Sequence, residues 1–182
     1  FSWRSGPGDG ISGNTVTSAE AVSYVLWEMS APITLFTGKY RFLSNFFPSP
    51  VVLDGIRYPT VEHAFQAAKT DSDHERRLIC AARSPKDAKR IGRSLTLPPD
   101  WEETKLGIMK ELLRQKFQNP ALRQALQDTG SAELIEGNVW GDTYWGCVLS
   151  ENAWVGANHL GRLLMEVRSC TERAMNQQAS AL

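Results

Sequence analysis

The stretch Tyr58-Pro59-Thr60-Val61-Glu62-His63-Ala64-Phe65-Gln66-Ala67-Ala68-Lys69 decides the fold that we expect. Its apolar residues recur at the spacing of one helix face, and they are Val61, Ala64, Phe65 and Ala68. This pattern predicts a helix over residues 60–69 with that face toward the core. Glu62, Gln66 and Lys69 fall together on another face of the helix. That polar edge is either an ordinary solvated surface or one wall of a pocket.

A β-hairpin is predicted immediately before this helix. Val51–Leu53 and Ile56–Tyr58 are short apolar runs that flank Asp54-Gly55. Both central residues of such a turn need a positive φ, which Asp and Gly tolerate. Further strands are expected at Ile33–Phe36 and Glu133–Glu136.

Helices dominate the rest of the chain. Besides residues 60–69, we expect them at residues 84–92, 100–117, 119–130 and 158–171. Ser84 followed by Pro85, and Asp100 followed by Glu103, are typical helix starts. Two loops are expected, Gly38–Pro48 and Asn138–Ala157, and a loop as long as the second is usually functional. The fold class is therefore α+β, a mostly helical single domain with a small β-hairpin or sheet.

The length of 182 residues fits one domain with additional terminal segments. Residues 1–30, rich in Gly and Ser at their start, are expected to be a flexible arm, either without regular structure or with a short helix at Ala19–Met29. We expect a catalytic domain over residues 31–175 and a C-terminal tail over residues 176–182.

Composition limits the partners and the compartment. Lys and Arg together number 20, as do Asp and Glu, so no strong basic field is present to grip a long polyanion. Cys80, Cys147 and Cys170 lie far apart, which argues against a disulfide framework and against a zinc site. A reducing compartment fits this, cytoplasmic or, in a eukaryote, nuclear. The sequence contains no apolar run of about 18 residues, so no membrane span is predicted.

Several common kinds of catalytic site are disfavoured. His63, His74 and His159 lack the spacing of metal ligands, so neither a metal nor another cofactor is expected. G-x-S-x-G, P-loop and G-x-G-x-x-G motifs are also absent from the sequence. The acids, amine, amides and aromatic rings that remain suit a ligand with a flat base and a sugar. A carboxylate can stabilise the positive charge that develops on a sugar when its glycosidic bond breaks.

Each candidate also has a purely structural interpretation. Glu62 lies in the first turn of its helix, where the helix dipole already favours a carboxylate. Lys69 alone is more often a solvated lysine, and Trp101 can simply cover the start of its helix. The segment Gly141–Gly146 is harder to explain in this way, because it holds an acid and two rings between glycines. Loops of this kind commonly carry binding residues.

Several separate motifs follow one another along the chain. They are Phe42-Leu43-Ser44-Asn45-Phe46, the stretch from Tyr58 to Lys69, Ala88-Lys89-Arg90-Ile91-Gly92-Arg93, Trp101 with Lys105, Met109 and Lys116-Phe117, Tyr144-Trp145-Gly146, and Gly156-Ala157-Asn158-His159-Leu160-Gly161-Arg162-Leu163-Leu164-Met165. Through these motifs, over about residues 33–170, the chain resembles the NADAR family, which is also known by its YbiA-like members. The resemblance implies a YbiA-like fold and an N-glycosidase activity.

The resemblance also implies roles for single residues. Glu62 matches the catalytic glutamate, and Lys69 matches the lysine that closes its motif, acting as an electrostatic partner or as a Schiff-base nucleophile. Bacterial relatives carry an acid directly after the glycine that matches Gly146, whereas Cys147 follows here, so we assign the third catalytic position to Asp142. The expected substrate-binding residues supply rings, amides, a hydroxyl and a cation: Arg41, Phe42, Ser44, Asn45, Phe46, Trp101, Tyr144, Trp145, Gly146 and Asn158. Arg93 is an alternative to Arg41 as the partner of a phosphate.

The expected reaction removes ADP-ribose from ADP-ribosylated guanine in a nucleoside or a nucleic acid. One alternative is an N-glycosidase that acts on early aminouracil ribotides of the riboflavin pathway. Another is a non-catalytic module that binds ADP-ribose. A metal-assisted nucleic-acid hydrolase is disfavoured by the histidine spacing. The expected partner is an ADP-ribose-containing nucleotide or nucleic acid, and we expect a monomer with no membrane association.

Overall fold

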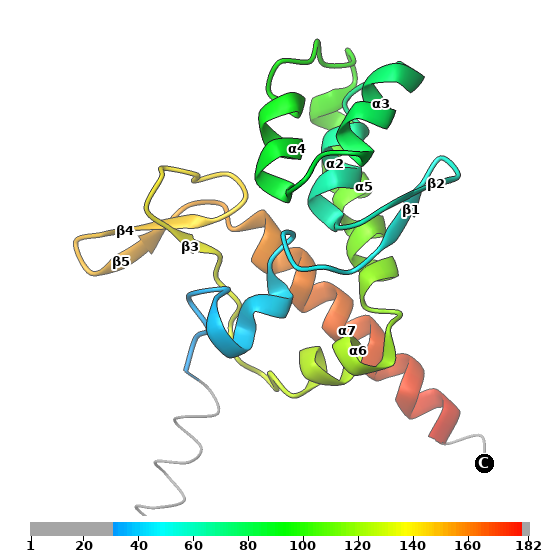
Figure 1. Ribbon diagram of the computed structural model, residues 1–182. Coiled ribbons are helices and arrows are strands. Elements are labelled where there is room, and N and C mark those ends of the chain that lie inside the picture. Colours follow the sequence, from blue (N-terminus) through cyan, green and yellow to red (C-terminus); the bar gives the residue numbers. More distant parts are fainter. Residues whose placement is uncertain (1–30, 180–182) are drawn as a thin grey trace, which may run out of the picture.

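Two long helices, α5 (Trp101–Lys116) and α7 (His159–Ala179), pack against each other in the centre of the computed structural model, which describes residues 31–179 (Figure 1). Their contact forms part of the core, to which they contribute Met109, Leu112, Leu113, Leu160, Leu164 and Val167. The predicted arm over residues 1–30, with its helix at Ala19–Met29, lies outside the described residues, as do residues 180–182 of the predicted tail.

The predicted hairpin is confirmed. Strands β1 (Val51–Leu53) and β2 (Ile56–Tyr58) pair antiparallel, and the turn residues Asp54 and Gly55 have φ values of 49° and 76°. Tyr58 is fully buried at the end of β2. The hairpin therefore delivers the chain into the core at the point where helix α2 (Val61–Ala67) begins.

Helix α2 is buried along its whole length. The side chain of Thr60 caps it by accepting a hydrogen bond from the N–H of His63. Helices α3 (Asp73–Cys80), α4 (Pro85–Gly92) and α5 surround it, together with the hairpin. Glu62 and Gln66 are as inaccessible as the apolar stripe, at 5% and 3% exposure. The solvated interpretation of this polar edge is therefore wrong.

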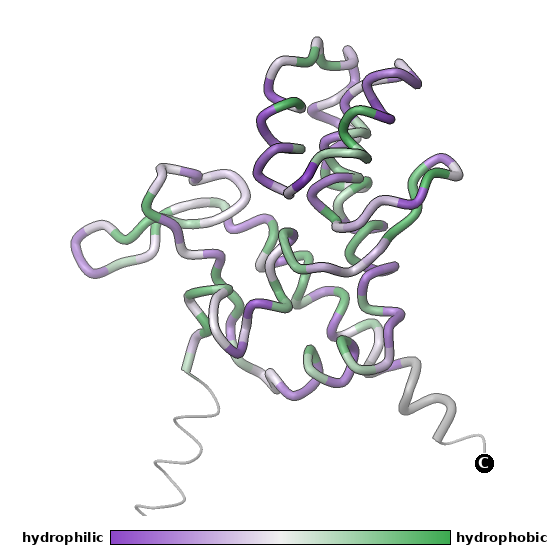
Figure 2. The backbone as a smooth tube through the Cα atoms, in the orientation of Figure 1, coloured by the Kyte–Doolittle hydropathy of each residue, from purple (hydrophilic) through white to green (hydrophobic). Residues whose placement is uncertain are grey.

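The capping signals place most of the other helices. Ser84 caps α4 by accepting from the N–H of Asp87, and Asn119 caps α6 (Pro120–Gln127) in the same way. Asp100 precedes α5 as predicted, but its side chain makes no capping hydrogen bond. Helix α4 is mostly hydrophilic and has a few hydrophobic positions (Figure 2), as expected for a helix with one face on α2 and another toward solvent.

The C-terminal half differs most from the prediction. The expected loop Asn138–Ala157 contains strands β4 (Cys147–Ser150) and β5 (Ala153–Val155), which pair antiparallel, while β3 (Gly137–Asn138) pairs parallel with β4. Glu151 and Asn152 make the β4–β5 turn with φ values of 47° and 68°. The sequence does not predict this turn, because Glu rarely takes a positive φ. This small sheet forms a lobe beside the helices (Figure 1).

Four further predictions need correction. The strands expected at Ile33–Phe36 and Glu133–Glu136 are reduced to a single parallel bridge between Ile33 and Leu134. The expected loop Gly38–Pro48 begins with a 3₁₀ helix, η1 (Gly38–Leu43). Helix α3 was not predicted, because its sequence DHERRLIC has few apolar residues to mark a stripe. Helix α7 continues beyond residue 171 to Ala179 and so takes in part of the expected tail.

Candidate active site

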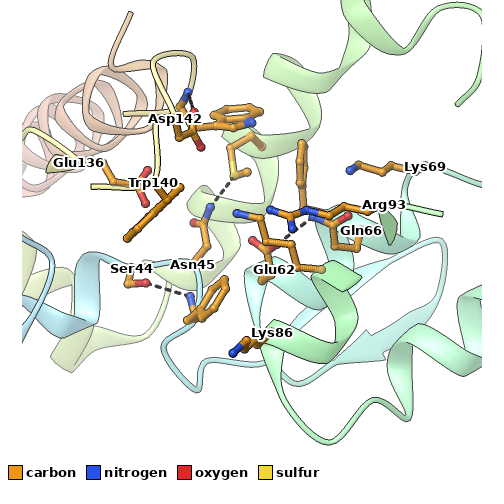
Figure 3. A pocket seen from close by; sticks show the side chains of 16 residues that line it. Ser44, Asn45, Glu62, Gln66, Lys69, Lys86, Arg93, Glu136, Trp140 and Asp142 are labelled. Atoms are coloured by element: carbon orange, nitrogen blue, oxygen red, sulfur yellow. Dashed lines mark hydrogen bonds between the residues drawn. The ribbon is translucent and has the colours of Figure 1, made fainter. Parts of the chain in front are cut away.

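A cavity of about 610 Å³ opens between α2, α4, α5, the segment after η1 and the segment that joins β3 to β4 (Figure 3). Its lining combines three carboxyl groups, one from α2 and two from a distant part of the chain, with amides, cations and rings. The lining residues are Ser44, Asn45, Phe46, Glu62, Phe65, Gln66, Lys69, Lys86, Lys89, Arg93, Met109, Glu136, Trp140, Gly141, Asp142 and Trp145. In Figure 3, Glu136 and Trp140 lie on one side of the cavity and Glu62 and Gln66 on the other.

Glu62 is held firmly in the wall of this cavity. Its N–H donates to the carbonyl of Asn45 over 3.1 Å, and its Oε1 accepts from Nε2 of Gln66 over 2.8 Å. Burial raises the pKa of the Glu62 carboxyl, while Lys89, the Gln66 amide, Lys69 and Arg93 oppose this. A carboxyl whose pKa is raised keeps its proton to higher pH than an ordinary glutamate, which suits a group that takes part in proton transfer.

Lys69 reaches the same cavity from just beyond the end of α2. Its N–H donates to the carbonyl of Gln66 over 3.3 Å, and its Nζ lies 5.9 Å from the ring centroid of Phe65 and 5.7 Å from that of Trp101. Burial lowers the pKa of the Lys69 ammonium, and Glu62 opposes this. A lowered pKa leaves more of the amine neutral, which is the form that can attack a carbonyl carbon.

Asp142 lies in the cavity lining, and one of its oxygens shapes the segment that follows. Its Oδ1 accepts from the N–H of Tyr144 over 3.1 Å and from that of Trp145 over 2.9 Å, and its own N–H donates to Oδ1 of Asn138 over 2.9 Å. These contacts are an Asx turn. They fix the place of Trp145, whose ring meets that of Phe65 edge-on at 5.2 Å.

Glu136 is a cavity residue that sequence reasoning missed as a functional candidate, since Glu133–Glu136 was interpreted only as a strand. Burial raises the pKa of its carboxyl to about 7, with Asp142 and Glu62 adding to the rise and Lys89 opposing it. No local motif marks this residue. Its position depends on contacts with β4 and with the residue before α7, which only the fold brings together.

Three cations of the α4 region line the cavity: Lys86, Lys89 and Arg93. Lys86 and Lys89 are one helical turn apart, and Arg93 follows as the C-terminal cap of the helix. Arg93 had been named as an alternative phosphate partner, and its position in the lining agrees with that. Arg41, the first choice, is exposed and outside the lining.

Of the predicted substrate-binding residues, Ser44, Asn45, Phe46 and Trp145 line the cavity. Trp101 does not: it is 5% exposed and packs on Phe65, with ring centroids 5.2 Å apart. Phe42 packs edge-on against Phe117 at 6.4 Å. Both rings therefore pack against other rings of the fold, and neither lines the cavity. Trp140, by contrast, is 65% exposed at the cavity and was not selected from the sequence.

Tyr144, Gly146 and Asn158 also lie outside the cavity lining. The Tyr144 ring stacks beside His159 at 4.4 Å and lies 3.8 Å from Nζ of Lys105. Asn158 uses its side chain on the backbone, because Oδ1 accepts from the N–H of Glu136 and Nδ2 donates to the carbonyl of Leu134. Asn158, predicted to hold a ligand hydroxyl or phosphate, thus bonds through its side chain to the backbone of Glu136 and Leu134.

Within residues 31–179, the His, Cys, Asp and Glu side chains form no group of three placed to hold a metal ion. Over the same described range, no helix combines the length and the apolar character needed to cross a membrane.

Comparison with known proteins identifies the family of the chain. The NADAR domain family matches residues 34–171. N-glycosidase YbiA of Escherichia coli is 36% identical over 153 residues, which cover 82% of this chain and 93% of that protein. The NMR structure of E. coli YbiA has a TM-score of 0.66 at 37% identity and covers 82% of this chain and 89% of that chain.

Two other relatives carry different names. N-glycosidase Npun_R5314 of Nostoc punctiforme is 38% identical over 135 residues, covering 71% of this chain and 84% of that protein. Riboflavin biosynthesis protein PYRR, chloroplastic, of Zea mays is 35% identical over 144 residues, covering 69% of this chain and 22% of that protein. With its α+β fold, its motifs and these matches, the chain belongs to the NADAR family.

Proposed function

We propose that the chain is an N-glycosidase that hydrolyses the C–N bond between a base and ribose. The observation that carries this proposal is the presence of Glu62 and Lys69 in one cavity, the first held by Gln66 and the second beside aromatic rings. The names of the E. coli and Nostoc relatives support it.

Glu62 is the carboxylate that assists cleavage of the glycosidic bond. As the C–N bond breaks, positive charge develops on the sugar, and a nearby carboxylate stabilises that charge. Water adds to the anomeric carbon and gives up a proton. The buried surroundings of Glu62 strengthen both effects, because charges interact more strongly where water is excluded.

Lys69 has two possible roles that an experiment can separate. As an ammonium ion it is an electrostatic partner of Glu62. As a neutral amine it attacks the aldehyde form of an opened ribose, forming a Schiff base that water later releases. Borohydride added during turnover should then reduce the adduct and leave a stable mass increase on Lys69. Normal turnover by Lys69→Ala would contradict the covalent route.

The substrate that we favour is ADP-ribosylated guanine. The α4 cations Lys86, Lys89 and Arg93 give the cavity a wall that suits the two phosphates of ADP-ribose. The cavity is also of a size typical for small-molecule sites. An aminouracil ribotide, with one phosphate, is the second candidate, and the riboflavin-pathway name of the maize relative favours it.

The deciding experiment incubates the protein in parallel with ADP-ribosylated guanosine and with aminouracil ribotide. Mass spectrometry measures free base together with ADP-ribose or ribose phosphate. We expect release of guanine-containing product and little from the ribotide; the reverse result would replace the first substrate by the second. Glu62→Gln, which should still bind, is the control for enzyme-dependent release. Binding without any product in the wild type would favour a non-catalytic ADP-ribose reader.

A further inference from the structure

The backbone of Glu136 is held on both sides by residues from distant motifs. Its N–H donates to Oδ1 of Asn158 over 3.1 Å, and its carbonyl accepts from the N–H of Cys147 over 2.9 Å. A Cβ at position 146 would lie 2.1 Å from that carbonyl oxygen, so only glycine fits there. Gly146 and Asn158 thus fix the position of Glu136 in the wall of the cavity.

The surroundings of Glu136 differ from those of Glu62. Burial raises the pKa of Glu62, but Glu62 also receives a hydrogen bond from Gln66 and faces Lys69, Lys89 and Arg93, which favour its ionised form. Glu136 faces the carboxyl groups of Asp142 and Glu62, which disfavour its ionisation, and Lys89 is the cation that opposes them. When two carboxyl groups in one site have such different neighbours, they take different roles in proton transfer.

We propose that Glu136 is the acid that donates a proton to the leaving base, while Glu62 is the carboxylate that accepts a proton from water. This assignment rests on the proposed glycosidase function. It follows from the placement of the two groups across one cavity, with donors and cations around Glu62 and carboxyl groups around Glu136 (Figure 3). Each group would touch a different side of the glycosidic bond.

The proton balance of the step is complete. The C–N bond breaks, its electron pair goes to the base nitrogen, and that nitrogen takes the proton of Glu136. Water forms the new C–O bond at the anomeric carbon and gives one proton to Glu62. Glu136 then carries the negative charge and Glu62 the proton. Transfer of that proton from Glu62 back to Glu136, directly or through water, restores the starting state without any co-reactant.

The test uses Glu136→Gln with two substrates that differ only in the leaving group, ADP-ribosylated guanosine and its N7-methylated form. The methylated base carries a positive charge before cleavage and leaves without needing a proton. We expect Glu136→Gln to lower kcat at least 100-fold on the first substrate, as loss of a general acid does, and less than 10-fold on the second. Retained turnover of the methylated substrate also shows that the variant is folded.

Glu62→Gln is the matched control, and it should lose turnover on both substrates. A second readout is the pH profile: kcat of the wild type should fall above pH about 7, and this fall should be missing in Glu136→Gln. Equal losses on the two substrates, or no loss on either, would overturn the role of Glu136 while leaving the glycosidase function intact. If the wild type cleaved neither of these substrates nor the aminouracil ribotide, the proposed function itself would be overturned, and this assignment with it.

Discussion

The side-chain amide of Gln66 donates from Nε2 to Oε1 of Glu62 over 2.8 Å, and both residues are buried on helix α2. The other end of the same amide lies against α4, because a Cβ on Gly92 would be only 1.9 Å from Oε1 of Gln66. The orientation of Glu62 is thus set by a residue one turn further along its helix and by the missing side chain at position 92.

Replacing Gln66 by Leu should weaken catalysis without removing the catalytic carboxyl. A hydrogen bond to a charged group is typically worth about 1.5–3 kcal/mol, so we expect kcat to fall roughly 10- to 100-fold. Because the amide opposes the raised pKa of Glu62, its loss should move the acidic limb of the kcat profile to higher pH. Turnover measured from pH 4 to pH 9 checks this. An unchanged profile would show that the amide does not act through Glu62.

Gly92→Ala should reproduce much of that defect from a position outside the cavity lining. The new Cβ takes the space of Oε1 of Gln66 and pushes the amide away from Glu62. Gly107→Ala is the matched control, since a Cβ there meets no atom within 4 Å and Ala stabilises a helix by up to about 1 kcal/mol relative to Gly. The double variant Gly92→Ala/Gln66→Leu should be no slower than Gln66→Leu alone, whereas additive losses would mean that Gly92 acts by another route.

The local sequence patterns predicted the side of the site formed by α2 and α4 better than the side that carries Glu136. The helix periodicity placed Glu62 and Gln66 on one edge, and the hairpin and capping signals placed α2 and α4 around it. Glu136 escaped notice because its importance depends on Cys147 and Asn158, which lie far from it in sequence. The backbone contacts of Asn158 could not be predicted for the same reason, because an amide in a motif looks the same whether it binds a ligand or a backbone.

The two tryptophans Trp101 and Trp140 should respond to mutation in opposite ways. Trp101 is 5% exposed and packs on Phe65, so Trp101→Ala should cost about 3–5 kcal/mol of folding free energy. Trp140 is 65% exposed at the cavity, so Trp140→Ala should leave the Tm nearly unchanged and raise KM. Thermal melts and steady-state kinetics of both variants check this. An unchanged KM in Trp140→Ala would remove its ring from the substrate site.

Lys116 should make folding stability depend on pH in the alkaline range. The side chain is 1% exposed, its Nζ donates to the carbonyl of Ser44 over 2.8 Å, and burial lowers the pKa to about 7. Between this value and the ordinary pKa of lysine, the unfolded chain binds more protons than the folded chain. Folding stability therefore rises with pH from about 7 to about 10.

Lys116→Met removes this titration while keeping a long side chain. The free energy of unfolding of the wild type relative to Lys116→Met should therefore increase by roughly 2–4 kcal/mol between pH 7 and pH 10. Lys39→Met, at an exposed position, should show no such trend. Denaturant titrations at several pH values measure the differences. A constant difference across this range would mean that Lys116 stays protonated in the folded protein.

The carboxyl of Glu136 should reduce folding stability at pH 8. Its pKa is raised by burial to about 7, so between the ordinary value for Glu and about 7 the folded chain binds more protons than the unfolded one, and stability falls as pH rises. At pH 8, Glu136→Gln should therefore be more stable than the wild type by about 1–3 kcal/mol. The advantage should shrink toward zero near pH 4, where the carboxyl is protonated in both states.

Glu103→Gln, at an exposed position, should show no gain at either pH. Denaturant unfolding at pH 4 and pH 8 makes the comparison. A gain in stability together with a loss of turnover would identify Glu136 as a group kept in the cavity for its chemistry, whereas a variant less stable than the wild type at pH 8 would show that the carboxylate is held by favourable contacts instead.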